Sequence, residues 1–160
     1  MKMTEKKKGK IKWFLTIMSV VLSIATLVAV CVGLNNLTQT TKNVDRNDYA
    51  IGTIAESGKI VESKQSAYMK DAESVHGLTI EIDEETATIT YKVAFYDEDG
   101  KFISMTEEME TDFESTNVPA NAVTFRVVIT PYQVDGENVE LNIFNLGKYT
   151  SQLDVSFAKI

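Results

Sequence analysis

The sequence predicts an all-β protein, an antiparallel β-sandwich preceded by a single amino-terminal transmembrane α-helix. Residues 13–34 form one uncharged apolar run. From residue 78 onward, apolar and polar residues alternate at the period of two that half-buried strands show. Turn-forming residues separate the alternating runs. Two facing sheets would bury the apolar face of every strand at once, which is why a sandwich is expected.

The amino-terminal part divides into a basic tail and the apolar run. Residues 1–12 carry six lysines and one glutamate, a balance of +5. The run from Trp13 to Leu34 has 22 residues, and a helix of that length spans about 33 Å, close to the hydrocarbon thickness of a bilayer. Because the lysines lie on one side, the positive-inside rule keeps the amino terminus in the cytoplasm and exports residues 35–160. We expect a single-pass cell-membrane protein, with Trp13 and Leu34 at the ends of its anchor.

Two other fates of the apolar run stay open. A cleaved signal peptide has a shorter apolar core and small residues at its cleavage site, and residues 28–33 offer only a poor site. The single cysteine, Cys31, follows a segment that resembles a bacterial lipobox, but Val30 stands where that motif has a small residue. An uncleaved membrane helix, with Cys31 as an apolar residue within it, is favoured over both.

Charge and composition limit what the exported part can do. The whole chain carries −7 and its first twelve residues +5, so residues 35–160 carry −12. Such a domain repels a phosphate backbone, and nucleic-acid binding is not expected. His76 is the only histidine, and no cysteine lies beyond Cys31. A zinc site or a Cys-His nucleophile lacks its usual residues, so the sequence favours a protein that is not an enzyme.

The exported part opens with segments of weak pattern. Residues 35–49 are polar and without period, which is typical of a tether, so the sandwich is expected over residues 50–160. Residues 61–75 suit either a short helix or a first strand. A strand at residues 66–70 is preferred, because a sandwich needs partners for its edges.

Six later segments alternate apolar and polar residues and are predicted to be strands. They span residues 78–82, 89–95, 101–104, 123–129, 139–143 and 153–157. Polar turns separate several of them, at residues 83–85, 97–100 and 135–136. The acidic segment 106–117 is predicted to be a surface excursion or an irregular strand.

The stretch Asp97-Glu98-Asp99-Gly100 has two interpretations. A calcium loop of the EF-hand type has further oxygen ligands and a distal glutamate, whereas here Lys101 and Phe102 follow the glycine directly. Asp-Gly between alternating runs is typical of a hairpin, because glycine accepts the positive φ of the turn. The turn is favoured, and a structural calcium ion bound by Asp97 and Asp99 is the alternative. No other cofactor is expected.

Four segments also succeed one another in a familiar order: SAY at 66–68, GLTI at 77–80, VAFYDEDGKFIS at 93–104 and VPANAVTFRV at 118–127. This order resembles jelly-roll modules of the galactose-binding or carbohydrate-binding type, found in bacterial surface and phage tail proteins. The resemblance covers about residues 60–160 and implies a jelly-roll sandwich. Such modules include sugar binders and purely structural pieces, so it specifies fold better than function.

If the module binds a glycan, aromatic faces would stack on the sugar rings. Tyr96, Tyr132 and Tyr149 are the candidate ligand-binding tyrosines, since each lies off the alternating core or near a turn. Packing in the core or at its rim is the alternative for each. Arg126 lies mid-strand, opposite the apolar face, and is either a cross-strand partner for a carboxylate or a clamp for a ligand. The only tryptophan, Trp13, lies at the membrane and not on such a platform.

The sequence thus favours a non-catalytic binding module at the bacterial cell surface, held by one membrane helix. Cell-envelope glycan is the leading ligand class, by resemblance. The alternative is a protein-interaction subunit of a bacterial membrane complex, in which small residues along the helix pack against a partner.

Overall fold

The computed structural model describes Met18 and residues 40–159. The chain divides between Gln39 and Thr40, and the fold described below is that of the second unit. Within these described residues, no helix has both the length and the apolar character needed to cross a membrane. The expected anchor from Trp13 to Leu34 lies outside the described residues, with the exception of Met18. The basic tail and residues 35–39 also lie outside them.

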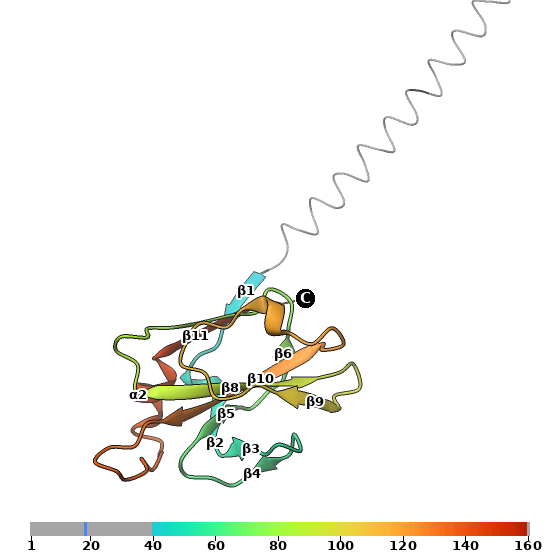
Figure 1. Cartoon of the computed structure of the whole chain (residues 1–160). Helices are drawn as coiled ribbons and strands as arrows, with labels where there is room; N and C mark the ends of the chain where they lie inside the picture. Colours follow the sequence, from blue (N-terminus) through green and yellow to red (C-terminus); the bar gives the residue numbers. More distant parts are fainter. Residues whose placement is uncertain (1–17, 19–39, 160) are drawn as a thin grey trace, which may run out of the picture. The chain divides into compact units, whose positions relative to one another are not determined.

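Two antiparallel sheets form the body of the domain (Figure 1). The smaller sheet has the order β1 (Thr40–Asn43), β11 (Leu153–Lys159), β7 (Thr79–Ile82). The larger sheet has the order β2 (Tyr49–Ile51), β5 (Ala67–Met69), β10 (Thr124–Pro131), β8 (Ile89–Tyr96), β9 (Phe102–Met105), and β6 (Glu73–Ser74) also pairs with β10. The fold is therefore all-β, sandwich-like and compatible with a jelly roll.

The remaining elements are short. Strands β3 (Thr53–Ile54) and β4 (Ile60–Val61) form a hairpin of their own. The helical turns are η1 (Arg46–Asp48), η2 (Ser115–Asn117) and α2 (Leu146–Thr150).

The main core lies between the two sheets. Phe157 of β11 meets Phe125 of β10 edge to face, with ring centroids 5.8 Å apart. The side chains that alternate inward from β7 and β11 pack with those from β8 and β10: Ile80, Ile82, Leu153, Val155, Tyr91, Val93, Phe95, Val127 and Ile129. The period of two therefore encodes this core directly.

A second, smaller cluster covers the outer face of the larger sheet. Ile54 of the β3–β4 hairpin packs there with Ala94, Tyr96 and Val128. Strand β8 is consequently buried on both faces over most of its length. The hairpin turn lies close to the sheet, since a Cβ at Gly58 would come within 2.3 Å of Phe102.

Five of the six predicted strands are present, as β7, β8, β9, β10 and β11, and the preferred early strand is β5. Both predicted Asp-Gly turns are also present. In the second, Asp135 and Gly136 have φ of 53° and 80°, the combination that a type I′ turn requires. The irregular strand expected in segment 106–117 pairs only through isolated bridges, at Met109 and Phe113.

Two expectations differ from the structure. Residues 139–143 are not a strand, because Asn142 and Asn145 bind backbone groups locally and close a turn. Residues 40–49 are not a tether, because Thr40–Asn43 pairs with β11 over four residues and Tyr49 is buried in the core. Residues 40–49 therefore belong to the folded domain.

Candidate functional site

The three candidate tyrosines do not form one platform. Tyr96 and Tyr149 are only 6% and 7% exposed, Tyr96 beneath the β3–β4 hairpin and Tyr149 in the main core. Tyr132, which follows β10, is 37% exposed. Two of the three rings are thus packing residues, and only Tyr132 offers part of a face to a ligand.

Arg126 packs against an aromatic ring on the outer face of the larger sheet. Its guanidinium carbon lies 5.6 Å from the ring centroid of Tyr96, a distance typical of cation–π contact. Burial raises the pKa of Tyr96, and the positive charge of Arg126 opposes that shift. Within residues 40–159, the Tyr96 hydroxyl and the Arg126 Nε are buried without hydrogen-bond partners. A hollow of about 260 Å³ nearby is lined by Phe102, whose ring centroid lies 6.0 Å from that of Tyr96.

The DEDG stretch is the tight turn between β8 and β9. One carboxylate oxygen of Asp97 accepts the backbone N–H groups of Asp99 and Lys101, at 3.0 and 2.8 Å. Gly100 has φ of 74°, as the turn requires. Among the residues that the structure describes, no three acidic, histidine or cysteine side chains are grouped to hold a metal ion.

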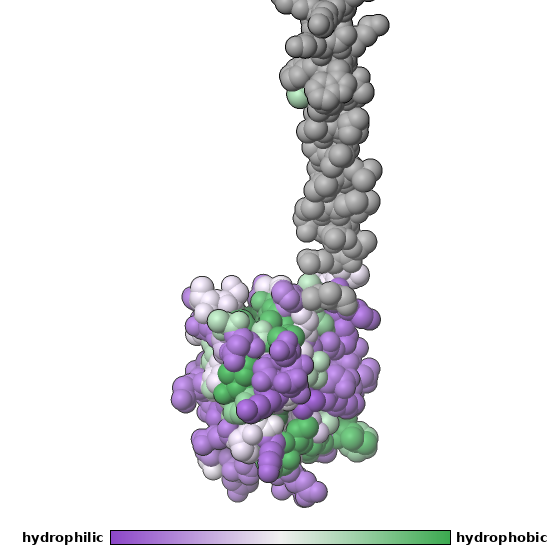
Figure 2. Space-filling view, turned by 90° about the vertical axis from the view of Figure 1, so that its right-hand side faces the viewer, coloured by the Kyte–Doolittle hydropathy of each residue, from purple (hydrophilic) through white to green (hydrophobic). Residues whose placement is uncertain are grey.

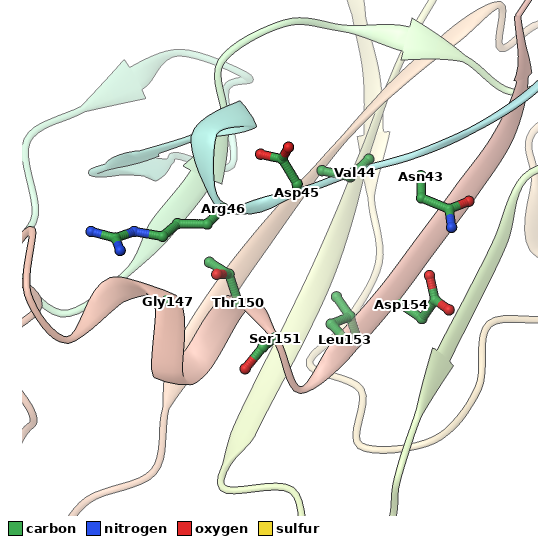
Figure 3. A pocket seen from close by; sticks show the side chains of 9 residues that line it. All are labelled: Asn43, Val44, Asp45, Arg46, Gly147, Thr150, Ser151, Leu153 and Asp154. Carbon is green, nitrogen blue, oxygen red and sulfur yellow. The ribbon is translucent and has the colours of Figure 1, made fainter.

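A polar hollow of about 450 Å³ lies between β1 and η1 on one side and α2 and β11 on the other (Figure 3). The side chains of Asn43 and Asp154 point toward one another across it (Figure 3). Asp45 is already engaged, because its carboxylate accepts the N–H of Asn47 at 2.6 Å and caps η1. The Asn43 amide, the Asp154 carboxylate and the Thr150 hydroxyl in the lining are hydrogen-bonding groups suited to a small hydroxyl-rich ligand.

The segment between β10 and α2 displays the most exposed large apolar side chains of the domain. Phe144 is 89% exposed and Ile143 is 64% exposed. Both lie in residues 140–146, which we call the apolar turn. Its flanks, Leu141 and Leu146, are buried in the main core, so the turn is anchored on both sides of the two displayed residues.

Hydrogen bonds hold the apolar turn in one conformation. The side-chain oxygen of Asn142 accepts the N–H groups of Phe144 and Asn145, at 2.9 and 3.1 Å. Asn145 in turn accepts the N–H of Asn142 at 2.8 Å and donates to the carbonyl of Glu140 at 2.9 Å. Arg46 donates from η1 to the carbonyl of Ile143. The backbone around Phe144 is therefore well satisfied, while its side chain has no cover.

A second hollow, also of about 450 Å³, adjoins the apolar turn and is lined by Ile51, Lys64, Glu140, Leu141, Asn142 and Ile143. Figure 2 shows apolar surface in separate patches among largely hydrophilic side chains on another face of the molecule. An exposed phenylalanine in a fixed turn beside a hollow is the kind of feature that protein interfaces use.

The sequence reading missed this turn. Ile143 fits the alternation of Val139 and Leu141 and therefore reads as a strand residue. Two signals pointed the other way: Phe144 directly after Ile143 breaks the alternation, and Asn142 and Asn145 are turn-forming residues.

Comparisons of the chain with protein-family models, with curated protein sequences and with solved structures gave no match.

Proposed function

We propose that this chain is a membrane-anchored, non-catalytic binding protein whose exported domain binds a protein partner through the apolar turn. The observation that carries the proposal is the 89% exposure of Phe144 on a turn whose backbone is fixed by hydrogen bonds. Aromatic side chains, phenylalanine among them, are enriched in the cores of protein interfaces, and rigid presentation lowers the cost of binding. This is the protein-interaction role that the sequence left as its alternative.

The membrane part of the proposal is supported by the sequence. The 22-residue apolar run and the lysines before it favour a helix with its amino terminus in the cytoplasm. The test is labelling of intact cells with a membrane-impermeant maleimide, in the full chain with Cys31→Ser. We expect labelling of Glu98→Cys, in the exposed β8–β9 turn, and none of Lys7→Cys. The reverse pattern would contradict the proposed topology.

The binding part is tested on the full chain in detergent-solubilised membranes by native electrophoresis. We expect a complex larger than the chain alone, and expect Phe144→Ser to reduce it strongly. Val123→Ser is the matched control, because Val123 is a 44% exposed apolar residue just before the first residue of β10, at the end remote from the segment that leads to the apolar turn. A complex that survives Phe144→Ser unchanged would contradict binding through this turn.

Glycan binding is the second candidate, favoured by the facing side chains of Asn43 and Asp154 in the polar hollow (Figure 3). It is tested by co-sedimentation of residues 40–160 with purified bacterial cell walls, with and without a calcium chelator. Saturable binding that is weakened by Asn43→Ala or Asp154→Ala would assign the binding function to this hollow. Loss on chelation would show that a calcium ion takes part.

A further inference from the structure

We infer that the apolar turn docks into an apolar pocket of a protein partner, and that lysine or arginine side chains border this pocket. The inference rests on the proposed binding function and adds the chemistry of the partner. It draws on three properties of the turn: its rigidity, its charge and its place in the fold.

Rigidity makes Phe144 an effective anchor. Five hydrogen bonds made by the side chains of Asn142, Asn145 and Arg46 fix the turn. The buried leucines on either side tie it to the core. A partner therefore loses little affinity to ordering of this loop, since the conformation that presents Phe144 is formed beforehand.

The segment that carries the turn is acidic. Residues 133–145 contain Asp135, Glu137 and Glu140 and no lysine or arginine. Two cationic side chains of the described residues also reach the turn, Lys64 at 3.9 Å from Glu140 and Arg46 at the carbonyl of Ile143. Three carboxylates against two cations leave an excess of one negative charge, on a chain whose residues 35–160 carry −12. Complementarity therefore favours a partner with a basic rim. A second copy of this acidic chain, or an anionic lipid surface, would meet repulsion instead.

The place of the turn makes it accessible to a partner. In Figure 1 the segment between β10 and α2 lies at the end of the domain opposite to the start of β1. The apolar turn is therefore well separated from the first residue of the domain, Thr40.

The test is photo-cross-linking from the turn in the cells that make the protein. The photoreactive residue p-benzoylphenylalanine replaces Phe144 in the full chain, and replaces Val123 in the control. We expect at least about tenfold more adduct from position 144, as for an anchor against an uninvolved surface residue. Mass spectrometry of the adduct then identifies the partner and its cross-linked residue, which we expect to lie in an apolar pocket flanked by lysine or arginine.

Charge reversal tests the basic rim separately. We expect Glu137→Lys with Glu140→Lys to reduce the adduct about tenfold or more, since like charges would then face each other. The control is Glu98→Lys with Asp99→Lys in the β8–β9 turn. It makes the same change in net charge and should leave the amount of adduct unchanged. Circular dichroism of each variant confirms that the fold is intact.

Four outcomes would overturn the inference. These are an adduct with a second copy of the chain, an adduct with lipid, no adduct above the control, and a protein adduct that charge reversal does not reduce. The last would leave the proposed binding function standing and remove only the basic partner. No adduct from position 144, together with an unchanged complex in Phe144→Ser, would remove both.

Discussion

Tyr49 and Tyr91 are both almost fully buried, but their hydroxyl groups differ. The Tyr91 hydroxyl donates to the carbonyl of Thr111 at 2.6 Å, whereas that of Tyr49 has no partner in the described residues. Tyr91→Phe should therefore lower the free energy of unfolding by about 1–1.5 kcal/mol, and Tyr49→Phe should leave it unchanged or raise it slightly. Urea unfolding measures both, and an equal loss in the two variants would contradict this reading.

Gly58 and Gly100 form a second matched pair at the residue scale. Both have positive φ, 77° and 74°, but a Cβ at Gly58 would meet Phe102 at 2.3 Å while one at Gly100 meets nothing within 4 Å. Gly100→Ala should cost about 1 kcal/mol of stability from backbone strain alone. Gly58→Ala should cost about 1–3 kcal/mol more, from the clash. Equal losses in thermal unfolding would mean that the hairpin is not packed on Phe102.

At the scale of elements, β1 shows what a sequence pattern cannot reveal. Its four residues, TTKN, include no apolar side chain, so alternation gave no signal. The strand forms because its backbone pairs with β11 and because Lys42 reaches Glu73 at 2.8 Å. Strands β8 and β10, in contrast, were predictable because the period of two reports burial directly. Pairing partners and the exposure of Phe144 depend on tertiary contacts, which no local pattern contains.

Removal of β1 tests this assignment. A fragment of residues 50–160 lacks β1, η1 and the buried Tyr49, so we expect it to be less stable than residues 40–160 by several kcal/mol, since a core aromatic alone contributes about 3–5 kcal/mol. Urea unfolding of the two fragments checks this. If the two fragments are equally stable, residues 40–49 do not stabilise the fold and act as a tether.

At the scale of the whole molecule, stability should fall in alkaline solution. Burial raises the pKa of both Tyr49 and Tyr91 above the ordinary value, so the unfolded chain loses these phenolic protons first, near pH 10. The contribution of the neutral tyrosines is fully present below about pH 10 and is lost progressively above it, at about 1.4 kcal/mol per pH unit for each. Unfolding at pH 9, 10 and 11 measures the slope. Tyr49→Phe should reduce the slope by up to about 1.4 kcal/mol per pH unit, and an unchanged slope would assign it to other groups.

The pairing of β1 with β11 has a consequence for folding under the topology that we propose. Thr40 lies opposite Lys159, so the first and last strands of the domain are neighbours that close a very long loop. Contacts so distant in sequence form late and slow folding. A chain that crosses a membrane from its amino-terminal side would deliver β1 long before β11. The β1–β11 pairing of the smaller sheet could therefore not form during translocation. The polypeptide would remain unfolded enough to pass through a membrane channel until β11 had emerged.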